Sequence, residues 1–488
     1  MADCGSQKLF DTEPTIKFDE ENVERQNLRS KCASFPWLLY LCSLAANLLM
    51  LSAGANTVWI SPILPRLQSN DTTINPLGRP LTLPETSILA SLVPLSGLIT
   101  YLPSAKLIDI IGRKKMLILI AIMLIINYIG AALARHVWSY YIFTIICGVT
   151  TSAILVSVPV YNNEIAEDGN RGKIGCFMGI TVPTGILLCY LYGPAVDVCT
   201  LFWIAISVPM LHLILAIFIV ESPTYLAQQK KKVECMNCLE RLRKYQGAKQ
   251  IELEYNKIEC IVVDYSKQKK RNVLDIFRSG PSRKAFLMSV IASATQQLSG
   301  IFILLGFMAT IFNDTGHISG DSFGIITGIV QIFVFFVSSL IVEKLGKRTL
   351  LLTSSIVCSI ALFCMGIYFH VKYLNPAHTD NLIWLPISFL VVFIVGYGIG
   401  LGPVPITLPA ELFPNDLRAT GCASVMLIDN AIMAITMFFF PVVKEYFGVQ
   451  YYMWFFSACC IIGAALTYFF VSETRGKSFV QIQDELNW

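Results

Sequence analysis

The sequence predicts an all-α membrane protein with twelve transmembrane helices arranged in two pseudo-symmetric six-helix bundles. Of the 488 residues, 55% are hydrophobic and 14% are charged, whereas soluble domains carry about 25% charged residues. The hydrophobic residues gather in blocks of about 20, the length that crosses a bilayer core as a helix. Helices are expected because lipid offers no water to satisfy an open backbone. A duplicated set of charged motifs, described below, divides the blocks into two sixes.

The apolar blocks follow one another with short polar loops between them. We expect spans near residues 36–62, 86–108, 115–134, 138–161, 174–194, 201–220, 285–312, 321–342, 349–370, 382–408, 419–440 and 451–471. The chain then divides into an N-terminal tail (1–35), a first bundle (36–221), a polar loop (222–284), a second bundle (285–471) and a C-terminal tail (472–488). Apolar residues of the polar loop, such as Cys238, Leu239 and Leu242, predict short amphipathic helices lying on a membrane surface.

The positive charges predict the orientation of the chain. Only five of the 37 lysines and arginines fall in the odd-numbered loops: Arg66, Arg79, Arg135, Lys372 and Lys444. The other 32 lie in the two tails, the even-numbered loops and the adjoining helix ends. Loops rich in lysine and arginine remain in the cytoplasm. Both termini and the polar loop are therefore expected to be cytoplasmic, in a membrane that we expect to be the plasma membrane.

The glycosylation sequons agree with this orientation. The sequence contains two, at Asn70 and Asn313. They fall in the first and seventh loops, which the charges place outside. N-glycans are attached to exposed loops, so we expect both asparagines to be glycosylated.

Three charged motifs occur twice in the same order, each time about half a chain apart. The pairs are Asp109–Lys115 (with Gly112 and Arg113) and Glu343–Thr349 (with Lys347 and Arg348), Glu164 with Arg171 and Glu411 with Arg418, and Glu221 and Glu473. All of these residues lie at the expected cytoplasmic helix ends. Two bundles of one design indicate a transporter, with its site between the halves.

The acidic residues of these motifs are suited to forming a gate at the cytoplasmic side. A carboxylate can accept hydrogen bonds from arginine and from the exposed N–H groups at a helix start. We expect such pairs to join the two bundles, close the cytoplasmic side and break when the bundles rock. The alternative is that the basic residues only anchor the topology.

Taken together, the motifs resemble the sugar porter family of the major facilitator superfamily. The resemblance runs from about Gly54 to Gly476. It is carried by the motifs above and by Pro159–Tyr161, Glu221–Pro223, Gln296–Gly300, Gly402–Pro405, Pro409–Pro414 and Glu473–Ser478. Trp59–Pro65 and Pro80–Thr82 look most like the facilitated trehalose transporter branch. The resemblance implies the major facilitator fold and facilitative transport of a sugar, trehalose or a hexose-like polyol.

The chain departs from the family at several positions where sugar contacts are expected. The arginine often found in the fourth span is Thr144, and the fifth-span glutamine is Gly179. Phe302 replaces an asparagine, Ile406 the tenth-span tryptophan, and Asp429–Asn430 the eleventh-span Asn-Trp. These losses put the usual hexose in doubt.

Three amides are the first candidates for substrate contact. Gln296, Gln297 and Gln331 lie within the seventh and eighth expected spans, and the resemblance places the glutamine pair among the family's sugar contacts. Carboxamides can donate to and accept from sugar hydroxyls without bringing a charge. Alternatively, they hold helices together inside the membrane.

The tenth span contains an unusual density of glycine and proline, including Gly402, Pro403 and Pro405. Proline removes a backbone donor, and irregular backbone at membrane depth is tolerated where it is buried in protein or lines a cavity. We expect a gate beside the substrate site here, as opposed to a passive kink.

Asp429 is the one acid expected deep inside a span, about 15 Å along the helix. An ionised aspartate there costs roughly 2.5–3.5 kcal/mol on insertion scales. It is therefore expected to be protonated, paired or facing a water-filled cavity. With Asn430 it is a candidate for solute contact or proton uptake. Alternatively, it is a neutral replacement for the family's asparagine.

Other classes of function find little support in the sequence. The net charge of +4 arises from loops and does not suggest nucleic acid. Cys235 and Cys238 form a single CxxC with no second pair, a weak metal signal. There is no nucleotide-binding loop and no nucleophile with a base, so we expect no enzyme activity, cofactor or metal. The partners are a small solute and the bilayer. A non-transporting sugar sensor and a proton-coupled symporter of another polar solute stay open as alternatives.

Overall fold

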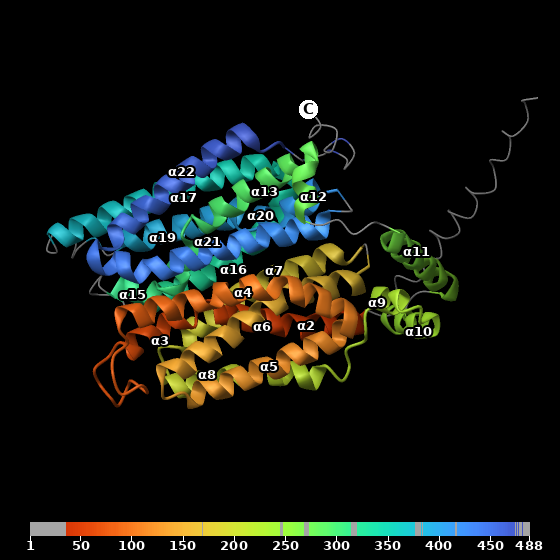
Figure 1. The fold of residues 1–488 in the computed structure, drawn as a ribbon, viewed down its shortest axis with the longest axis horizontal. Coiled ribbons are helices and arrows are strands. Elements are labelled where there is room, and N and C mark those ends of the chain that lie inside the picture. The colour runs from red at the N-terminus through yellow and green to blue at the C-terminus, as the bar shows by residue number, and fades with distance from the viewer. Residues whose placement is uncertain are drawn as a thin grey trace, which may run out of the picture.

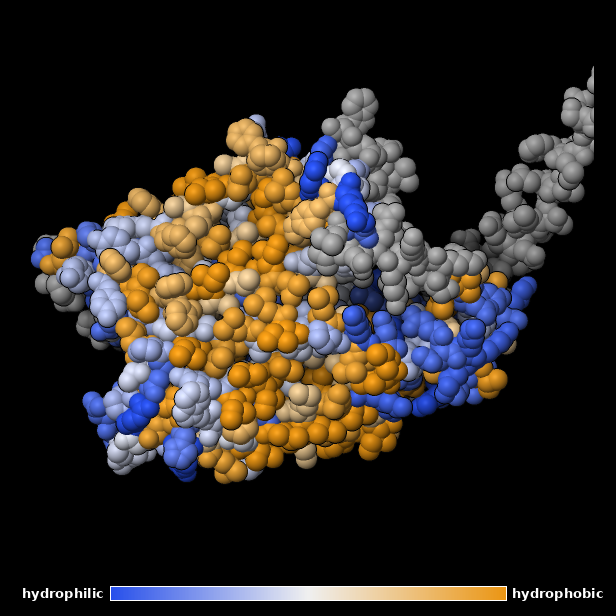
Figure 2. Space-filling model, viewed as in Figure 1, coloured by the Kyte–Doolittle hydropathy of each residue, from blue (hydrophilic) through white to orange (hydrophobic). Residues whose placement is uncertain are grey.

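The computed structural model describes residues 36–167, 169–244, 247–267, 273–313, 320–375, 382, 384–414, 417–473, 475, 477 and 481. Among these residues it is helical, with no strand. Twelve helices are long and apolar enough to cross a membrane. They stand side by side in two layers (Figure 1), and hydrophobic side chains cover most of the middle of the face that Figure 2 shows. The all-α membrane fold expected from the sequence is confirmed.

The N-terminal bundle contains the first six spans. Its helices are α2 (Trp37–Val58), α3 (Ile60–Leu67), α4 (Leu83–Ile111), α5 (Arg113–Leu133), α6 (Val137–Ile165), α7 (Arg171–Tyr192) and α8 (Val198–Leu215). Local chemistry sets several of the helix starts. Thr82 and Glu85 form a reciprocal cap on α4, which satisfies otherwise unpaired backbone donors. The Asp197 carboxylate accepts a hydrogen bond from Thr200 N at the start of α8, and its bonds to Thr200 lower the pKa of that carboxyl.

The C-terminal bundle repeats this plan with more interruptions. Its helices are α13 (Gly280–Gln297), α14 (Ile301–Gly306), α15 (Met308–Phe312), α16 (Gly320–Leu345), α17 (Lys347–Leu374), α19 (Trp384–Gly396), the π-helix η2 (Tyr397–Leu401), α20 (Val404–Leu412), α21 (Arg418–Tyr446) and α22 (Val449–Phe470).

Most spans differ from the expected bounds by a few residues at their ends, and two of these differences have a clear local cause. The sixth begins at Val198 instead of residue 201 and ends at Leu215, because the Asp197 cap fixes its start. The seventh begins at Gly280 and is broken after Gln297. Gly300 there adopts φ of 78°, a left-handed conformation that glycine tolerates and that ends a helix. Neither the Asp197 cap nor the helix break at Gly300 can be predicted from hydropathy alone.

A sharp turn at a glycine with positive φ joins corresponding spans in the two bundles. Gly112 joins α4 to α5 with φ of 95°, and Gly346 joins α16 to α17 with φ of 84°. A Cβ on Gly112 would lie 2.7 Å from Glu221 Oε2, and one on Gly346 would lie 2.6 Å from Glu473 Oε2. The two bundles thus share the same turn, capped by the same residue type, as the internal repeat predicts. We call the end of the molecule that carries these turns the motif end, and the end that carries Asn70 and Asn313 the sequon end.

The stretch between the bundles forms short helices at the motif end: α9 (Pro223–Gln228), α10 (Lys232–Leu242), α11 (Ala248–Lys267) and α12 (Val273–Arg278). The short helices were expected, but the apolar residues of α10 that suggested contact with a membrane surface pack on protein instead. Cys238, Leu239 and Leu242 are buried against the protein, and α9, α10 and α11 pack on one another and, through α9 and α10, on the N-terminal bundle. Figure 1 shows this group beyond the end of the spans.

Several helix pairs of the described residues join the bundles. α4 packs along α21, α7 along α16, α3 against α14 and α15, and α2 against α14. Glycines allow the close approach of α16, because Cβ atoms at Gly324 and Gly328 would lie 2.4 Å from the Tyr190 ring and 2.8 Å from Leu187 Cβ. The site is therefore to be sought along these contacts.

Candidate functional site

The motif end of the N-terminal bundle is held by a buried arginine and two glutamates. Arg113 is 3% exposed, and its Nε and Nη2 each donate to Glu164 across 2.8 Å. The backbone N–H groups of Arg113 and Lys114 both donate to Glu221 Oε1, at 2.9 and 3.1 Å. Glu221 therefore caps α5, where the helix dipole favours a negative charge, and Arg113 neutralises Glu164 through a bidentate pair. Asp109 adds a second carboxylate 3.1 Å from Arg113.

The C-terminal bundle repeats the arrangement with lysine in place of arginine. The backbone N–H groups of Lys347 and Arg348 donate to the carboxylate of Glu473, at 3.0 and 3.2 Å. The Lys347 ammonium pairs with Glu411. Arg348 donates to the Tyr468 carbonyl across 2.6 Å. The sequence prediction that carboxylates cap neighbouring helix starts is thus seen in both bundles.

One part of the expected gate differs from the structure. The Arg113–Glu164 and Lys347–Glu411 pairs each join helices of the same bundle, whereas the sequence interpretation placed such pairs between the bundles. Sequence spacing puts these residues at one end of the molecule but does not say which neighbour each side chain meets.

The remaining motif residues occupy helix ends. Arg171 and Arg418 are the first residues of α7 and α21, and the Arg171 side chain is exposed. Glu343 lies near the end of α16, and its side chain is outside the described residues.

Gln296 connects α13 to the broken tenth span. Its Nε2 donates to the Gly402 carbonyl across 3.0 Å and lies 3.2 Å from the Tyr397 hydroxyl. Here α19 passes into the π-helix, and Pro403 and Pro405 begin α20. The amide thus satisfies a carbonyl that the irregular backbone leaves without a helical partner. This geometry matches the interpretation of Gln296 as a tie between helices.

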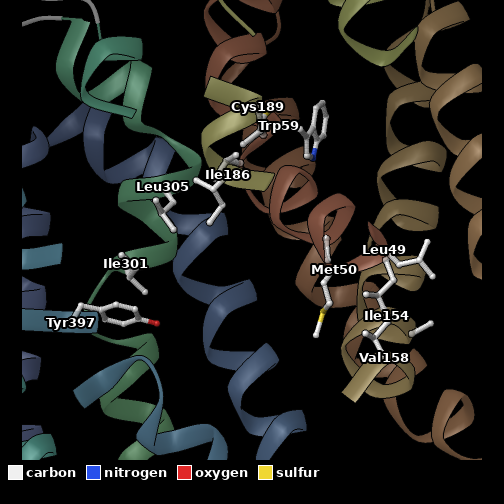
Figure 3. Close-up of a cluster of buried hydrophobic side chains, with 14 of the residues drawn as sticks. Leu49, Met50, Trp59, Ile154, Val158, Ile186, Cys189, Ile301, Leu305 and Tyr397 are labelled. Carbon is white, nitrogen blue, oxygen red and sulfur yellow. The ribbon is translucent and has the colours of Figure 1, made fainter. Parts of the chain in front are cut away.

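Tyr397 was not among the candidate residues identified from the sequence. Figure 3 shows it with Ile301 and Leu305 on the side of the C-terminal bundle. An aromatic residue among the glycines of the tenth span was its only sequence signal.

Gln297, Gln331 and Asp429 share a property that the other candidates lack. Each has a buried side-chain oxygen, Oε1, Oε1 and Oδ1 respectively, with no hydrogen-bond partner among the described residues. The Gln297 amide lies beside the Asp429 carboxyl. Leaving a buried polar atom unpaired costs about 1–3 kcal/mol, so such groups point to a ligand, an ion or water.

Asn430 lies at the contact between the bundles. Its Nδ2 donates to the Met426 carbonyl of its own helix across 2.9 Å. A Cβ on Gly97 of α4 would lie 2.7 Å from Asn430 Oδ1 and 2.9 Å from Ser152 Oγ. Asp429, the preceding residue, is therefore on the helix that packs directly against the opposite bundle. Gln297 and Asp429 together mark the candidate site.

Hydrogen bonds join the bundles at the sequon end. The backbone N–H of Ala309 in α15 donates to Ser61 Oγ of α3 across 3.0 Å. The Tyr190 hydroxyl of α7 donates to the Leu305 carbonyl of α14. These direct contacts hold the bundles together at that end.

The two sequon asparagines both lie at the sequon end. Asn70 is exposed in the loop between α3 and α4. Asn313 follows α15, and its Oδ1 accepts a hydrogen bond from Gly320 N across 2.7 Å. The remaining residues of the second sequon lie outside the described residues.

Sequence reasoning also missed a buried ion cluster beneath α10. Arg243 is 1% exposed, and its guanidinium lies 3.2 Å from Glu167 and 3.0 Å from Glu254. It also donates to the Ile165 carbonyl across 3.0 Å. Arg243 therefore connects α10 to the end of α6 and to α11. An arginine in a loop rich in basic residues carries no distinguishing signal in a single sequence.

The Cys235 and Cys238 thiols each donate to a backbone carbonyl, of Pro223 and Glu221 respectively. Burial raises the pKa of Cys235 to about 11 and that of Cys238 to about 12. Both thiols are therefore protonated at neutral pH, and a metal ligand would have to be a thiolate.

Comparison with known proteins gives consistent results. The chain is similar to a facilitated trehalose transporter, Tret1, of Drosophila virilis, with 26% identity over 92% of this chain and 49% of that protein. It resembles the Tret1 of Culex quinquefasciatus with 27% identity over 91% of this chain and 85% of that one. The chain spans about half the length of the Drosophila relative.

Among solved structures, the fold is similar to the xylose transporter XylE from E. coli. For the inward-open conformation of that protein the TM-score is 0.76, with 19% identity over 92% of this chain and 99% of that one. For a partially occluded inward-open conformation it is 0.74, with 20% identity over 90% and 99%. The arrangement of the helices is thus that of a known fold. A model of the family described as "Sugar (and other) transporter" matches residues 43–486, and the chain belongs to this family.

Proposed function

We propose that the protein carries a sugar across the membrane by facilitated diffusion, with the two bundles opening alternately to either side. The observation that carries this proposal is the set of unpaired oxygens of Gln297, Gln331 and Asp429 in the membrane-spanning part of a sugar-transporter fold. Sugar hydroxyls are donors of the kind that these oxygens lack. Trehalose is the first candidate substrate, because the relatives from flies and mosquitoes carry that name.

The contacts between the bundles support alternating access. At the sequon end, Ser61 and Ala309 form a direct hydrogen bond from one bundle to the other. At the motif end, the Arg113–Glu164 and Lys347–Glu411 pairs stay inside their own bundles. Each bundle is therefore stiffened separately at that end, as rigid-body rocking requires.

We further propose that the motif end faces the cytoplasm of a cell whose plasma membrane holds the protein, with both termini inside and Asn70 and Asn313 outside. The distribution of lysine and arginine supports this orientation. The test is the change in gel mobility when the glycosylated protein is treated with a glycosidase. Asn70→Gln and Asn313→Gln are each expected to remove one glycan and so part of this change. Glycosylation of a sequon engineered into residues 225–280 would contradict this orientation, because it would place that stretch outside the cell.

The transport proposal is tested with purified protein in liposomes. Vesicles preloaded with unlabelled sugar are diluted into labelled trehalose, glucose or xylose, and counterflow is followed without a membrane potential. Accumulation of at least one of the sugars, absent from protein-free vesicles, is the expected result. A folded protein that binds a sugar but exchanges none of the panel would instead be a sensor.

One observation favours a second candidate, proton-coupled transport. Asp429 is an acid inside a span, and its Oδ1 has no partner among the described residues. A carboxyl in that position can take up a proton with the solute. An imposed pH gradient distinguishes the two: it leaves the final internal sugar concentration unchanged in a facilitator and raises it above the external concentration in a symporter.

A further inference from the structure

A cavity inside the N-terminal bundle is separate from the candidate sugar site. Its volume is 250 Å³, and residues of α2, α5, α6, α7 and α8 line it. On α2 the lining residues lie along one helix face, from Leu51 to Asn56, and Trp59 follows between α2 and α3. Neither Gln297 nor Asp429 is among the lining residues, and the cavity lies within one bundle. We call it the side cavity.

The walls of the side cavity are mainly apolar and aromatic. Phe202 lies between two other rings, with ring centroids 6.0 Å from Trp59 and 6.5 Å from Tyr128. Figure 3 shows Trp59 beside Cys189, another lining residue. Apolar cavities stay dry and bind apolar molecules, so these walls favour a hydrophobic occupant over water.

One polar group in the lining has no partner. Asn127 is 3% exposed, and its Oδ1 makes no hydrogen bond within the described part of the chain. The neighbouring amide of Asn56 is satisfied, because Tyr128 donates to its oxygen across 2.8 Å and its nitrogen donates to Thr151 across 3.2 Å. One hydrogen-bond donor on an occupant of this otherwise apolar space would therefore satisfy the Asn127 oxygen.

The membrane is the natural source of the occupant. The two fully described helices α7 and α8 both line the cavity but make almost no contact with each other. Two lining residues, Tyr192 on α7 and Ser207 on α8, are exposed, and so are the apolar side chains of Leu191 and Trp203 on the same two helices. In a bilayer these surfaces contact lipid, so a molecule dissolved in the membrane reaches the cavity between α7 and α8.

We propose that the side cavity binds a small membrane-dissolved alcohol. Its apolar body lies against the Trp59 and Phe202 rings, and its hydroxyl donates to Asn127 Oδ1. A volume of 250 Å³ is below the about 300–1,000 Å³ of sites for drug-sized ligands, so the occupant is short. The ligand class is an aliphatic or terpenoid alcohol, distinct from the sugar of the proposed function.

The test uses two photoreactive probes of the same length. The first is 3-azioctanol, an eight-carbon alcohol with a diazirine, and the second is the matching azioctane without the hydroxyl. The full-length protein in liposomes is irradiated with each probe, with or without excess octanol. The labelled residues are then identified by mass spectrometry. In the parent protein, the alcohol is expected to label side-cavity residues such as Phe202 more strongly than the alkane does, and octanol is expected to compete.

Three variants complete the test. Asn127→Leu removes the acceptor and is expected to lower alcohol labelling about threefold to tenfold, the factor of one hydrogen bond, while alkane labelling is unchanged. Ala205→Phe places a ring in the cavity and is expected to remove labelling by both probes. Ile126→Phe is the control that adds a ring outside the cavity, since Ile126 is 56% exposed on α5, the helix of Asn127, and is not a lining residue.

Two results would overturn the proposal. One is alcohol labelling spread evenly over the lipid-facing helices of the parent protein. The other is equal labelling of the cavity by alcohol and alkane, which would make the occupant an acyl chain with no role for Asn127. The comparison of the two probes needs only the parent protein, so a variant that fails to fold does not leave the question open.

Discussion

At the scale of single residues, two neighbouring glutamines have different surroundings. Gln296 donates to Gly402 and lies beside the Tyr397 hydroxyl, whereas Gln297 keeps an unpaired buried oxygen and lies beside Asp429. The first amide supports the broken tenth span, and the second is available to a solute. Consecutive residues of one helix point in directions about 100° apart, which separates their roles.

Gln297→Ala is expected to weaken sugar affinity without loss of folded protein. Removal of one hydrogen bond costs about 0.5–1.5 kcal/mol, or roughly twofold to twelvefold in KM. Concentration-dependent counterflow in liposomes measures it. Gln296→Ala is the matched control, and there we expect a lower Tm, because Gly402 loses its donor. An unchanged KM in Gln297→Ala would assign Gln297 to structure.

Asp429→Asn keeps the size of the side chain and removes its charge. Because asparagine cannot ionise, we expect the variant to lose the part of the pH dependence of sugar affinity that the parent owes to this carboxyl. Affinity measured by tryptophan fluorescence between pH 5 and 8 checks this. A variant whose affinity and pH profile both match those of the parent would show that the charge has no role.

At the scale of elements, the turns at the motif end show what the repeated motif forms in each bundle. Gly112 and Gly346 both have positive φ, and both approach a capping glutamate. The turn, the cap and the following helix form one unit that positions Arg113 in one bundle and Lys347 in the other.

Gly112→Ala is expected to lower the stability of the protein by at least about 1–2 kcal/mol, the cost of a left-handed residue with a Cβ. The new methyl group would also meet Glu221 at 2.7 Å. Thermal unfolding in detergent reports the change as a lower Tm. Gly172→Ala is the control, since its Cβ would have no neighbour within 4 Å. Equal melting temperatures for both variants would contradict the structural role given to the turn.

Arg243→Ala is expected to release α10 and α11 from the N-terminal bundle. The substitution leaves Glu167 and Glu254 without their shared cation, and breaking a buried pair costs about 3–5 kcal/mol. Hydrogen exchange of residues 232–267 should become faster, while the spans keep their protection. The exposed Arg241, changed to alanine, is the control. Unchanged exchange in Arg243→Ala would show that other contacts hold these helices.

Much of this organisation was predictable from the sequence. Hydropathy located the spans, because a bilayer imposes length and polarity on each helix. The repeat located both capped turns, because a glutamate that recurs near a helix start is best explained as a cap of that helix. The partners of Arg113 and Arg243, and the role of Tyr397, were not predictable, since they depend on how helices far apart in the chain pack. The same is true of the side cavity, which five separate helices enclose.

At the scale of the whole molecule, the proposed mechanism requires the two bundles to move as separate rigid parts. Ion pairs stiffen each bundle at the motif end, and hydrogen bonds cross between bundles at the sequon end. Of the two candidate residues, Asp429 lies on α21, which packs along α4 of the opposite bundle. Rocking of the bundles would change the contacts of a solute held beside it.

The most direct test of alternating access is to lock the sequon end and measure sugar exchange. Ser61 and Ala309 are in direct contact across the bundles, so cysteines at both positions, Ser61→Cys with Ala309→Cys, can be joined by a short thiol cross-linker and released by a reductant. Each single-cysteine variant treated in the same way controls for modification of the native thiols. We predict that trehalose counterflow stops in the cross-linked double variant and returns after reduction. Exchange at the same rate in the locked and released protein would contradict the account.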